Sequence, residues 1–293
     1  MTGAEGVVLA VDIGGTKAVL RARGPDTDSG DLRFEWPAPV QCERDVDLLR
    51  ATARQALRLA GTARALRVVV AFPGTLDAAG HVTRWPTRPA WCGLRLADEL
   101  SEFGEVPPTI RDDAVLAGYA EAVARPALRD GMLYLGLGTG VGGAWLSPRP
   151  DRDPADLPGV DDLLPCEAGH LIVHPDTGRS CDCGRRGCLQ AHASGPAVHR
   201  WTTAHGRPAA LTDAAAACGL AITNIGELLP LAAVVLGGGF GAGDPGLPPA
   251  LRAALRRRAR QGGTVPRVLR ASYGAQASLR GALLLARAFV GAC

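Results

Sequence analysis

The chain has 293 residues, of which 47% are hydrophobic and 21% are charged, and its formal net charge is +3. This length suits two domains of ordinary size, and this composition is typical of a globular protein without a nucleic-acid-binding surface. No apolar run of about 18 residues free of glycine and charge is present, which argues against a membrane span.

The basic residues are almost all arginines, because Lys17 is the only lysine. The densest basic run, residues 252–260, has helical spacing. This spacing favours a solvated helix face over a grip on a phosphate backbone. The eight cysteines are not preceded by a basic and then apolar leader. We therefore expect free thiols in a reducing cytoplasm.

The chain opens with a predicted β-hairpin. Residues 7–13 and 17–23 read as strands, and the turn Gly14-Gly15-Thr16 joins them, with Asp12 at its mouth. The spacing of a P-loop is absent, but the N–H groups of such a turn can still bind phosphates. Asp12 could be a buried strand-end aspartate bonded to the turn. We favour a role in holding Mg²⁺, through waters.

An acidic pair follows the next predicted strands. Periodicity predicts helices over 45–60, 94–103 and 114–123, strands over 67–72 and 109–111, and a Trp/Pro-rich loop over 85–91. Asp113 could be the N-cap of the helix that begins at 114. A carboxylate at a strand end can also accept the proton of an attacking hydroxyl, and the phosphate-binding turns elsewhere in the chain favour this second role.

The hairpin pattern then recurs. Strands are predicted at 132–137 and 144–146 around a glycine turn at 138–143, and a third glycine site, Gly237–Gly239, follows a strand at 231–236. No helix directly follows the glycine turn, so a dinucleotide-binding site is not favoured. Two similar hairpins about 120 residues apart indicate an internal duplication, with two α/β lobes facing each other across a cleft. The remaining predicted segments are a loop at 148–164 and helices at 220–229, 251–260 and 279–290.

A cysteine-rich segment lies between the second and third glycine sites. His170, Cys181, Cys183 and Cys188 form a complete tetrahedral zinc set. The glycines in G-R-R-G before Cys188 permit the tight turns that bring three thiolates together. Four protein ligands leave no open position, so the sequence predicts a structural zinc site.

The motifs together resemble the ROK family, which includes bacterial glucokinases, other sugar kinases and sugar-responsive repressors. They are D-I-G-G-T-K at 12–17, P-G at 73–74, D-D at 112–113, G-L-G-T-G-V-G-G at 136–143, E-A-G-H with C-D-C-G-R-R-G-C-L at 167–189, and L-G-G-G at 236–239. The resemblance implies an actin-like, ribonuclease-H-like sugar kinase of two lobes that uses ATP and Mg²⁺ and forms a homodimer or tetramer. We expect a homodimer, with one lobe at 1–113 plus a helix at 278–293, and the other at 114–277.

The resemblance also assigns roles by matching position. Asp113 would be the general base for the sugar hydroxyl. The metal and the γ-phosphate would be bound by Asp12, Gly14, Gly15, Thr16 and Lys17. The other phosphates would be bound by Gly138, Thr139 and Gly140. The adenosine would lie beside Gly237, Gly238 and Gly239. Glu167 and His170 would bind sugar hydroxyls, and His170 would also bind zinc through its other nitrogen.

The chain departs from the family pattern where the sugar is bound. Asp112 stands where the family usually has Asn, Gln190 where it has Glu, and Thr87 where it has Asn. An added carboxylate at Asp112 could pair with an ammonium group. We therefore expect transfer to the primary hydroxyl of an amino-hexose such as kanosamine, or of a cyclitol. An ordinary glucokinase is the alternative.

Two further functions occur as alternatives to a sugar kinase. A sugar-responsive repressor of this family would need a helix-turn-helix domain, and about six residues precede the first predicted strand, so DNA binding is not expected. A non-catalytic sugar-binding regulator is the alternative from another class. The segment between Ser194 and Gly237 is shorter than usual for the family, which bears on oligomer contacts and the nucleotide lobe.

Overall fold

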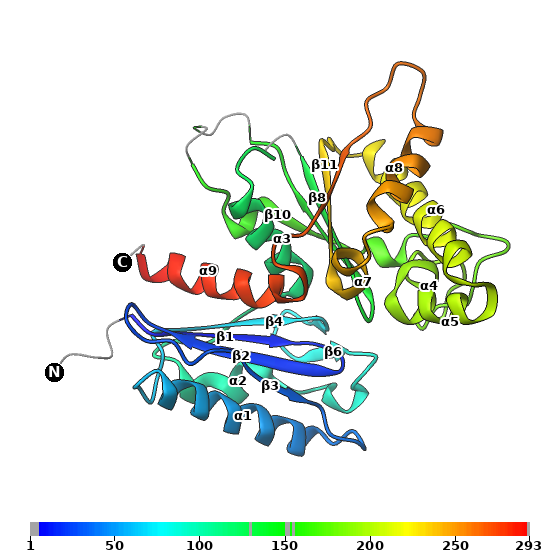
Figure 1. The fold of residues 1–293 in the computed structure, drawn as a ribbon. Coiled ribbons are helices and arrows are strands. Elements are labelled where there is room, and N and C mark those ends of the chain that lie inside the picture. Colours follow the sequence, from blue (N-terminus) through cyan, green and yellow to red (C-terminus); the bar gives the residue numbers. More distant parts are fainter. Residues whose placement is uncertain (1–5, 129–130, 150–152, 154–155, 292–293) are drawn as a thin grey trace. The chain divides into compact units, whose positions relative to one another are not determined.

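The computed structural model describes residues 6–128, 131–149, 153 and 156–291, and Figure 1 shows their fold. They divide into two compact units. Unit 1 comprises the residues up to Leu116 and those from Ser278 onward, and unit 2 comprises Ala117–Ala277. The borders thus lie at 116/117 and 277/278, where the sequence predicted 113/114 and 277/278. Cys293, one of the predicted free thiols, lies outside the described residues.

Unit 1 is built on a five-stranded sheet with the order β3-β2-β1-β4-β7. The first two strands form the predicted antiparallel hairpin, and β1, β4 and β7 run parallel. β2 alternates buried and half-buried residues, as its period-2 pattern requires, whereas β1 is buried almost throughout. The strands are β1 (Val8–Ile13), β2 (Lys17–Arg23), β3 (Leu32–Glu35), β4 (Arg67–Phe72) and β7 (Thr109–Asp112), with a separate pair, β5 (Thr75–Leu76) and β6 (Val82–Arg84).

Helices cover both faces of this sheet, with α1 (Cys42–Leu59) on one side and α9 (Ala277–Gly291) on the other (Figure 1). α1 begins three residues before the predicted helix and buries Leu49, Ala53 and Leu57 in the core of the unit. The predicted helix at 94–103 is a short α-helix followed by a 3₁₀ turn. The smaller helices are η1 (Pro89–Trp91), α2 (Leu96–Leu100) and η2 (Ser101–Phe103).

Unit 2 repeats the same sheet, with the order β10-β9-β8-β11-β12. Again an antiparallel hairpin, β8-β9, carries one further antiparallel strand on its outer side and two parallel strands on its inner side. This shared order is what the predicted internal duplication requires. The strands are β8 (Met132–Leu137), β9 (Val141–Leu146), β10 (Leu163–Cys166), β11 (Ala233–Gly237) and β12 (Arg267–Arg270).

The helices of unit 2 differ most from the prediction. The helix predicted at 220–229 is only the end of a 20-residue helix, and the helix before it was not predicted. The reason is composition, since alanine-rich residues 207–226 give little contrast between a buried and an exposed face. The predicted loop at 148–164 ends in a 3₁₀ turn and the start of β10. The helices are α3 (Asp113–Ala124), η3 (Val160–Asp162), η4 (Ala168–His170), α4 (Gln190–Ala193), α5 (Gly195–His205), α6 (Arg207–Gly226), α7 (Gly238–Gly243), α8 (Leu247–Arg258) and η5 (Gly274–Gln276).

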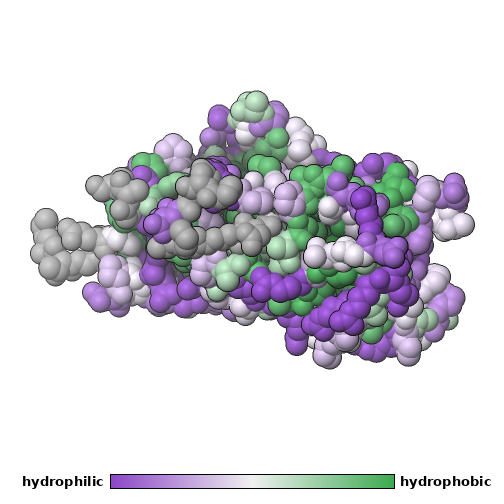
Figure 2. Space-filling model, turned by 90° about the horizontal axis from the view of Figure 1, so that it is seen from above, coloured by the Kyte–Doolittle hydropathy of each residue, from purple (hydrophilic) through white to green (hydrophobic). Residues whose placement is uncertain are grey.

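Among the helices of the described residues, only α6 is long and apolar enough to cross a membrane, and half of its apolar window is buried within the protein. Its buried residues belong to the core of unit 2, together with those of β8, β11 and α8. Burial of this kind is expected for a core helix. Hydrophilic residues cover much of the molecular face in Figure 2, with hydrophobic residues between them in patches.

Candidate active site

Three carboxylates lie at one edge of the sheet of unit 1. Asp12 is the second-last residue of β1. Asp112 ends β7, and Asp113 begins α3. β4 lies between these two strands and pairs with both, through Asp12 with Ala71 and Asp112 with Phe72. Because parallel strands end at the same edge of a sheet, residues 100 positions apart are brought together. The predicted general base Asp113 therefore lies close to Asp12, predicted to hold the metal, and to Asp112, predicted to bind the acceptor.

Burial dominates the electrostatics of these carboxylates. Burial and, to a smaller extent, the negative charges of Asp112 and Asp12 together raise the pKa of Asp113 to about 8, against two backbone hydrogen bonds that lower it. Burial likewise raises the pKa of Asp12 to about 7, although the positive charge of Lys17 opposes the shift. As whole residues, Asp12 and Asp113 are half-buried, and burial is the largest cause of both shifts. A carboxylate with a pKa near neutrality is a good proton acceptor for a hydroxyl.

The N-cap of α3 is Asp112 and not Asp113. Asp112 Oδ1 accepts a hydrogen bond from Val115 N over 3.0 Å, which is the usual bond of an N-cap to the third residue of a helix. Asp113 is the first helical residue. The capping alternative for Asp113 is therefore wrong, because the neighbouring carboxylate performs that role. Oδ1 of Asp112 is used for this cap.

The first glycine turn is closed by a hydrogen bond from Gly14 N to Lys17 O of 2.8 Å. Thr87, from the Trp/Pro-rich loop, packs against this turn. A Cβ atom at Gly15 would lie 3.1 Å from Thr87 Cγ2, so a larger residue at position 15 would push the loop away. The structure thus places Thr87, predicted on the acceptor side, beside a residue predicted to serve the γ-phosphate.

The second glycine turn in unit 2 is held by side chains and backbone from outside its hairpin. Gly138 N donates to Gly140 O within the turn over 2.9 Å, and Gly195 N donates to Gly138 O over 2.8 Å. Gln190 Oε1 accepts from Val141 N over 3.1 Å. Gln190, predicted to bind the acceptor, is therefore hydrogen-bonded to the end of the second glycine turn.

The N-terminus of α5 beside this turn was missed by the sequence interpretation. Ser194 caps α5 through a 3.3 Å bond from Ala197 N, and Pro196 occupies the first turn. Backbone N–H groups at the start of an 11-residue helix favour nearby negative charge. The Ser-Gly-Pro sequence at 194–196 is a helix-start signal that could have found it.

The third glycine site adjoins the second. β8 and β11 are parallel neighbours in which Gly136 pairs with Gly237, so both glycine sites lie at the same sheet edge. Gly238 has φ +74°, and a Cβ atom there would lie 2.5 Å from the backbone of Leu137. Only glycine tolerates this combination of conformation and close approach. Residues Gly138 to Gly140 and Gly237 to Gly239 are thus brought together within unit 2.

The E-A-G-H segment packs directly onto the start of β9. A Cβ atom at Gly169 would lie 2.2 Å from Val141 O, which explains the glycine in this motif. Glu167, just before η4, is exposed, and His170 is half-buried. Val141 therefore contacts the E-A-G-H segment on one side and Gln190 on the other.

The four predicted metal ligands form a cluster. The ligand atoms of His170, Cys181, Cys183 and Cys188 all lie within 4.8 Å of one another. His170 Nδ1 is 3.9 Å from Cys181 Sγ, and Cys183 Sγ is 3.6 Å from Cys188 Sγ. These separations fit one tetrahedral ion with bonds of about 2.0–2.3 Å. With Nδ1 turned to the cluster, Nε2 of His170 remains for another partner.

Glycines shape the loop that carries the cysteines. Gly184 and Gly187 have φ of +88° and +75°. A Cβ atom at Gly187 would lie only 1.9 Å from His174 O. The pKa of the Cys183 thiol falls to about 6: burial raises it, but hydrogen bonds from Arg185, Cys181 and Cys188 outweigh this effect. Cys183 is thus readily a thiolate, the form that binds metals.

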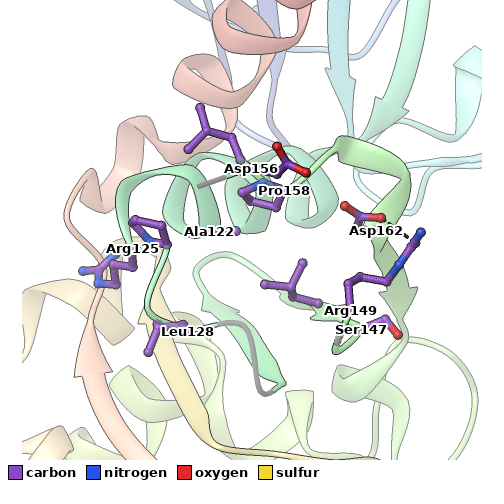
Figure 3. Close-up of a pocket in the computed structure, with 11 residues that line it drawn as sticks. Ala122, Arg125, Leu128, Ser147, Arg149, Asp156, Pro158 and Asp162 are labelled. Carbon is purple, nitrogen blue, oxygen red and sulfur yellow. Dashed lines mark hydrogen bonds and ion pairs between the residues drawn. The ribbon is translucent and has the colours of Figure 1, made fainter. Parts of the chain in front are cut away.

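A small pocket elsewhere in unit 2 is lined by none of the predicted site residues (Figure 3). It lies between α3 and residues 146–149 and 156–162, and its polar side chains include Arg125, Arg149 and Asp162. Arg149 Nη1 donates to Asp162 Oδ1 over 2.8 Å. This pocket is therefore separate from the carboxylate and glycine sites.

Comparisons with known proteins agree with this architecture. The chain matches the ROK family over residues 8–288. A kanosamine kinase from Amycolatopsis mediterranei strain S699 is 35% identical over 95% of both chains. A glucokinase from Thermotoga maritima is 30% identical over 66% of this chain and 59% of its own length.

The fold is shared with a ROK hexokinase from Thermus thermophilus, at a TM-score of 0.74 and 28% identity over 98% of this chain and all of the other. The predicted α/β class, with two mixed sheets, is confirmed. Family, fold and motif positions agree along nearly the whole sequence, and the chain belongs to the ROK family.

Proposed function

We propose that the protein transfers the γ-phosphoryl group of ATP to the primary hydroxyl of an amino-hexose, with kanosamine as the expected acceptor. The enzyme is a sugar kinase of the ROK family. The choice of kanosamine as the acceptor is supported mainly by the similarity to a kanosamine kinase over 95% of both chains. Asp112, Gln190 and Thr87, where the sequence departs from the glucokinase pattern, support the same choice.

Asp113 is the proposed general base. It receives the proton of the acceptor hydroxyl while that oxygen attacks the γ-phosphorus and the bond to the leaving ADP oxygen breaks. Its raised pKa of about 8 suits this role, because the base then holds the proton firmly as the new bond forms. The cap made by Asp112 fixes the start of α3 and thus the position of Asp113.

The glycine sites are proposed to bind the nucleotide. The turn Gly14–Thr16 with Lys17 serves the γ-phosphate, Gly138–Gly140 serves the other phosphates, and Gly237–Gly239 lies by the adenosine. Asp12 fits a role in holding Mg²⁺, since its buried carboxylate has only the charge of Lys17 to offset burial. When bound, Mg²⁺ neutralises charge on the phosphates.

A structural Zn²⁺ held by His170, Cys181, Cys183 and Cys188 is the proposed scaffold of the acceptor-binding residues. The cluster lies between η4 and α4, and so links Glu167 and His170 to Gln190 in the sequence. The actin-like arrangement of two lobes is also proposed, and the shared strand order of the two sheets supports it. The homodimer stays a proposal.

The cytoplasmic location expected from the sequence is proposed as well. No disulfide joins any of the seven cysteines in the described part of the chain, which supports a reducing compartment.

A substrate panel tests the acceptor. With ATP and coupled detection of ADP, we expect kcat/KM for kanosamine to exceed that for glucose by about 10-fold or more, since each unpaired buried polar group costs about 1–3 kcal/mol. The matched variant Asp112→Asn keeps a good N-cap and should reduce this preference. A higher value for glucose would identify a divergent glucokinase. Sugar binding without ADP release would identify a non-catalytic regulator.

Gln190 gives a second test, because its side chain holds the glycine turn at Val141. Gln190→Leu should raise KM for ATP by about 10-fold, since Val141 N then lacks its acceptor and the turn loosens. Gln190→Glu retains an oxygen for Val141 N and should leave KM for ATP nearly unchanged. Initial-rate kinetics over a range of ATP concentrations decide this. Equal KM values for ATP in both variants would show that the bond does not order the turn.

A further inference from the structure

A buried ion pair lies next to the loop that carries Thr87. Arg88 Nη1 donates to Asp45 Oδ2 over 2.6 Å, and the two side chains are 6% and 0% exposed. Trp91 Nε1 donates to the same carboxylate oxygen over 3.2 Å. A buried ion pair adds little net stability, because desolvation of both charges offsets their attraction. Conformational specificity is a second effect that such a pair can have.

Contacts run from this pair to the first glycine turn. The guanidinium carbon of Arg88 lies 5.0 Å from the ring centroid of Trp36. Trp36 in turn donates from Nε1 to Gly14 O over 2.7 Å and from its backbone N to Thr16 O over 3.0 Å. Asp45 on α1 is thus connected through Arg88 and Trp36 to both ends of the turn Gly14–Thr16.

Aromatic packing already fills the space around the pair. The ring centroids of Trp85 and Trp91 are 4.7 Å apart, and those of Trp36 and Trp91 are 5.6 Å apart. Within the described part of the chain, Asp45 Oδ1 and Arg88 Nε have no hydrogen-bond partner. The pair is therefore not a fully satisfied polar network, and packing of the loop does not require charges. The pair ties Arg88 of the loop to Asp45 of α1, and so restricts the position of the loop backbone at Arg88.

We propose that Asp45 and Arg88 are positioning residues for phosphoryl transfer, which hold the loop 85–91 so that Thr87 keeps its place against Gly15. This inference rests on the proposed function, in which Thr87 contacts the acceptor and Gly15 serves the γ-phosphate. A Cβ atom on Gly15 would lie 3.1 Å from Thr87 Cγ2, so the side chain of Thr87 leaves room there for a glycine alone. A misplacement of about 1 Å between reacting groups can cost about 100-fold in rate.

The test compares one double variant with one matched control. Asp45→Asn with Arg88→Met removes both charges, leaves no buried charge unpaired and keeps an oxygen for Trp91 Nε1. Arg54→Met is the control, because Arg54 on the same helix also makes an ion pair, with Glu102 over 2.8 Å, and lies 5.5 Å from the Phe103 ring. The pair of Arg54 and Glu102 is half exposed and lies away from the turn.

Two measurements are made on the full chain. The first is the determination of kcat and of KM for the acceptor and for ATP, with kcat calculated from the concentration of folded enzyme. We expect the double variant to fold, to lose about 100-fold in kcat/KM for the acceptor and to keep its KM for ATP. The second is hydrogen exchange of backbone amides in residues 85–92, which should become faster. The control should change neither quantity, and a purely structural role would lower the folded fraction alone.

Wild-type acceptor kinetics and wild-type exchange in the folded double variant would overturn the inference. An equal loss in Arg54→Met would do the same. If the double variant does not fold, Arg88→Lys is judged by the same readouts, since it keeps the charge but lacks the planar guanidinium. If the wild-type enzyme phosphorylates no sugar, the proposed function fails, and the exchange measurement alone still decides whether the pair positions the loop.

Discussion

Asp113→Asn is expected to lower kcat by about 10²–10⁴-fold, because the acceptor hydroxyl loses its proton acceptor. Asn matches Asp in size, so the packing of α3 should persist. Binding of ATP and of the sugar should also persist, since the amide still accepts a hydrogen bond. Steady-state kinetics combined with calorimetric binding separate these effects. Turnover within about tenfold of the wild type would show that another group is the base.

The pH dependence of the wild-type enzyme follows from the same carboxylate. Only ionised Asp113 accepts a proton, and burial raises its pKa to about 8. In the free enzyme, kcat/KM for the acceptor should therefore fall as the pH drops below about 8. Asp112→Asn removes the charge that is the second cause of this shift. That variant should move the acid limb to lower pH, whereas an unmoved limb would exclude Asp113 as its source.

As the pH rises, the contribution of Asp113 to folding stability should fall, whereas activity should rise. The folded-state pKa of Asp113 lies above its usual value of 3.8, so the folded state binds this proton more tightly between about pH 4 and 8. The resulting stability is complete below the unfolded pKa and is lost as the pH rises through about 8. Asp113→Asn avoids that loss. Its thermal midpoint at about pH 9, without Mg²⁺, should exceed that of the wild type.

Removal of zinc is expected to abolish activity by unfolding the segment between His170 and Gln190. Structural zinc binding contributes an apparent free energy of about 10–16 kcal/mol at neutral pH, which exceeds the stability of most domains. Without the ion, three thiol groups are held in close proximity by the turns at Gly184 and Gly187 and by backbone hydrogen bonds such as that from Gly187 N to Arg179 O. Chelation should therefore lower the thermal midpoint, and faster hydrogen exchange should be confined first to residues 171–189.

Cys183→Ser tests the same site without a chelator. It should reduce the zinc content and the thermal midpoint together, because a serine hydroxyl is a poor zinc ligand. Cys92→Ser, which changes an exposed thiol outside the cluster, is the matched control and should have little effect. Metal analysis of pure, active wild-type enzyme is decisive. Less than about half an equivalent of zinc would contradict a structural site.

Local sequence was sufficient for the strands around the glycine turns and for the clustering of the predicted metal ligands. The strands 17–23, 67–72 and 132–137 have the predicted bounds, because β-branched or alternating residues next to glycine specify both the strand and its end. The clustering of Cys181, Cys183 and Cys188 likewise follows from short spacing and glycine turns. These features depend on neighbours within a few residues, where propensity and steric limits act.

Tertiary structure alone decided the partners of several site residues. Gln190 meets Val141, and Arg88 meets Asp45, across 49 and 43 positions of the chain. Which of the two adjacent aspartates caps α3 depends on the direction in which β7 delivers the chain to the helix. Packing of whole elements sets such contacts, and no local pattern encodes their geometry. The sequence by itself determined which residue types are available to the candidate site, and the folded arrangement decided which side chains hold them in place.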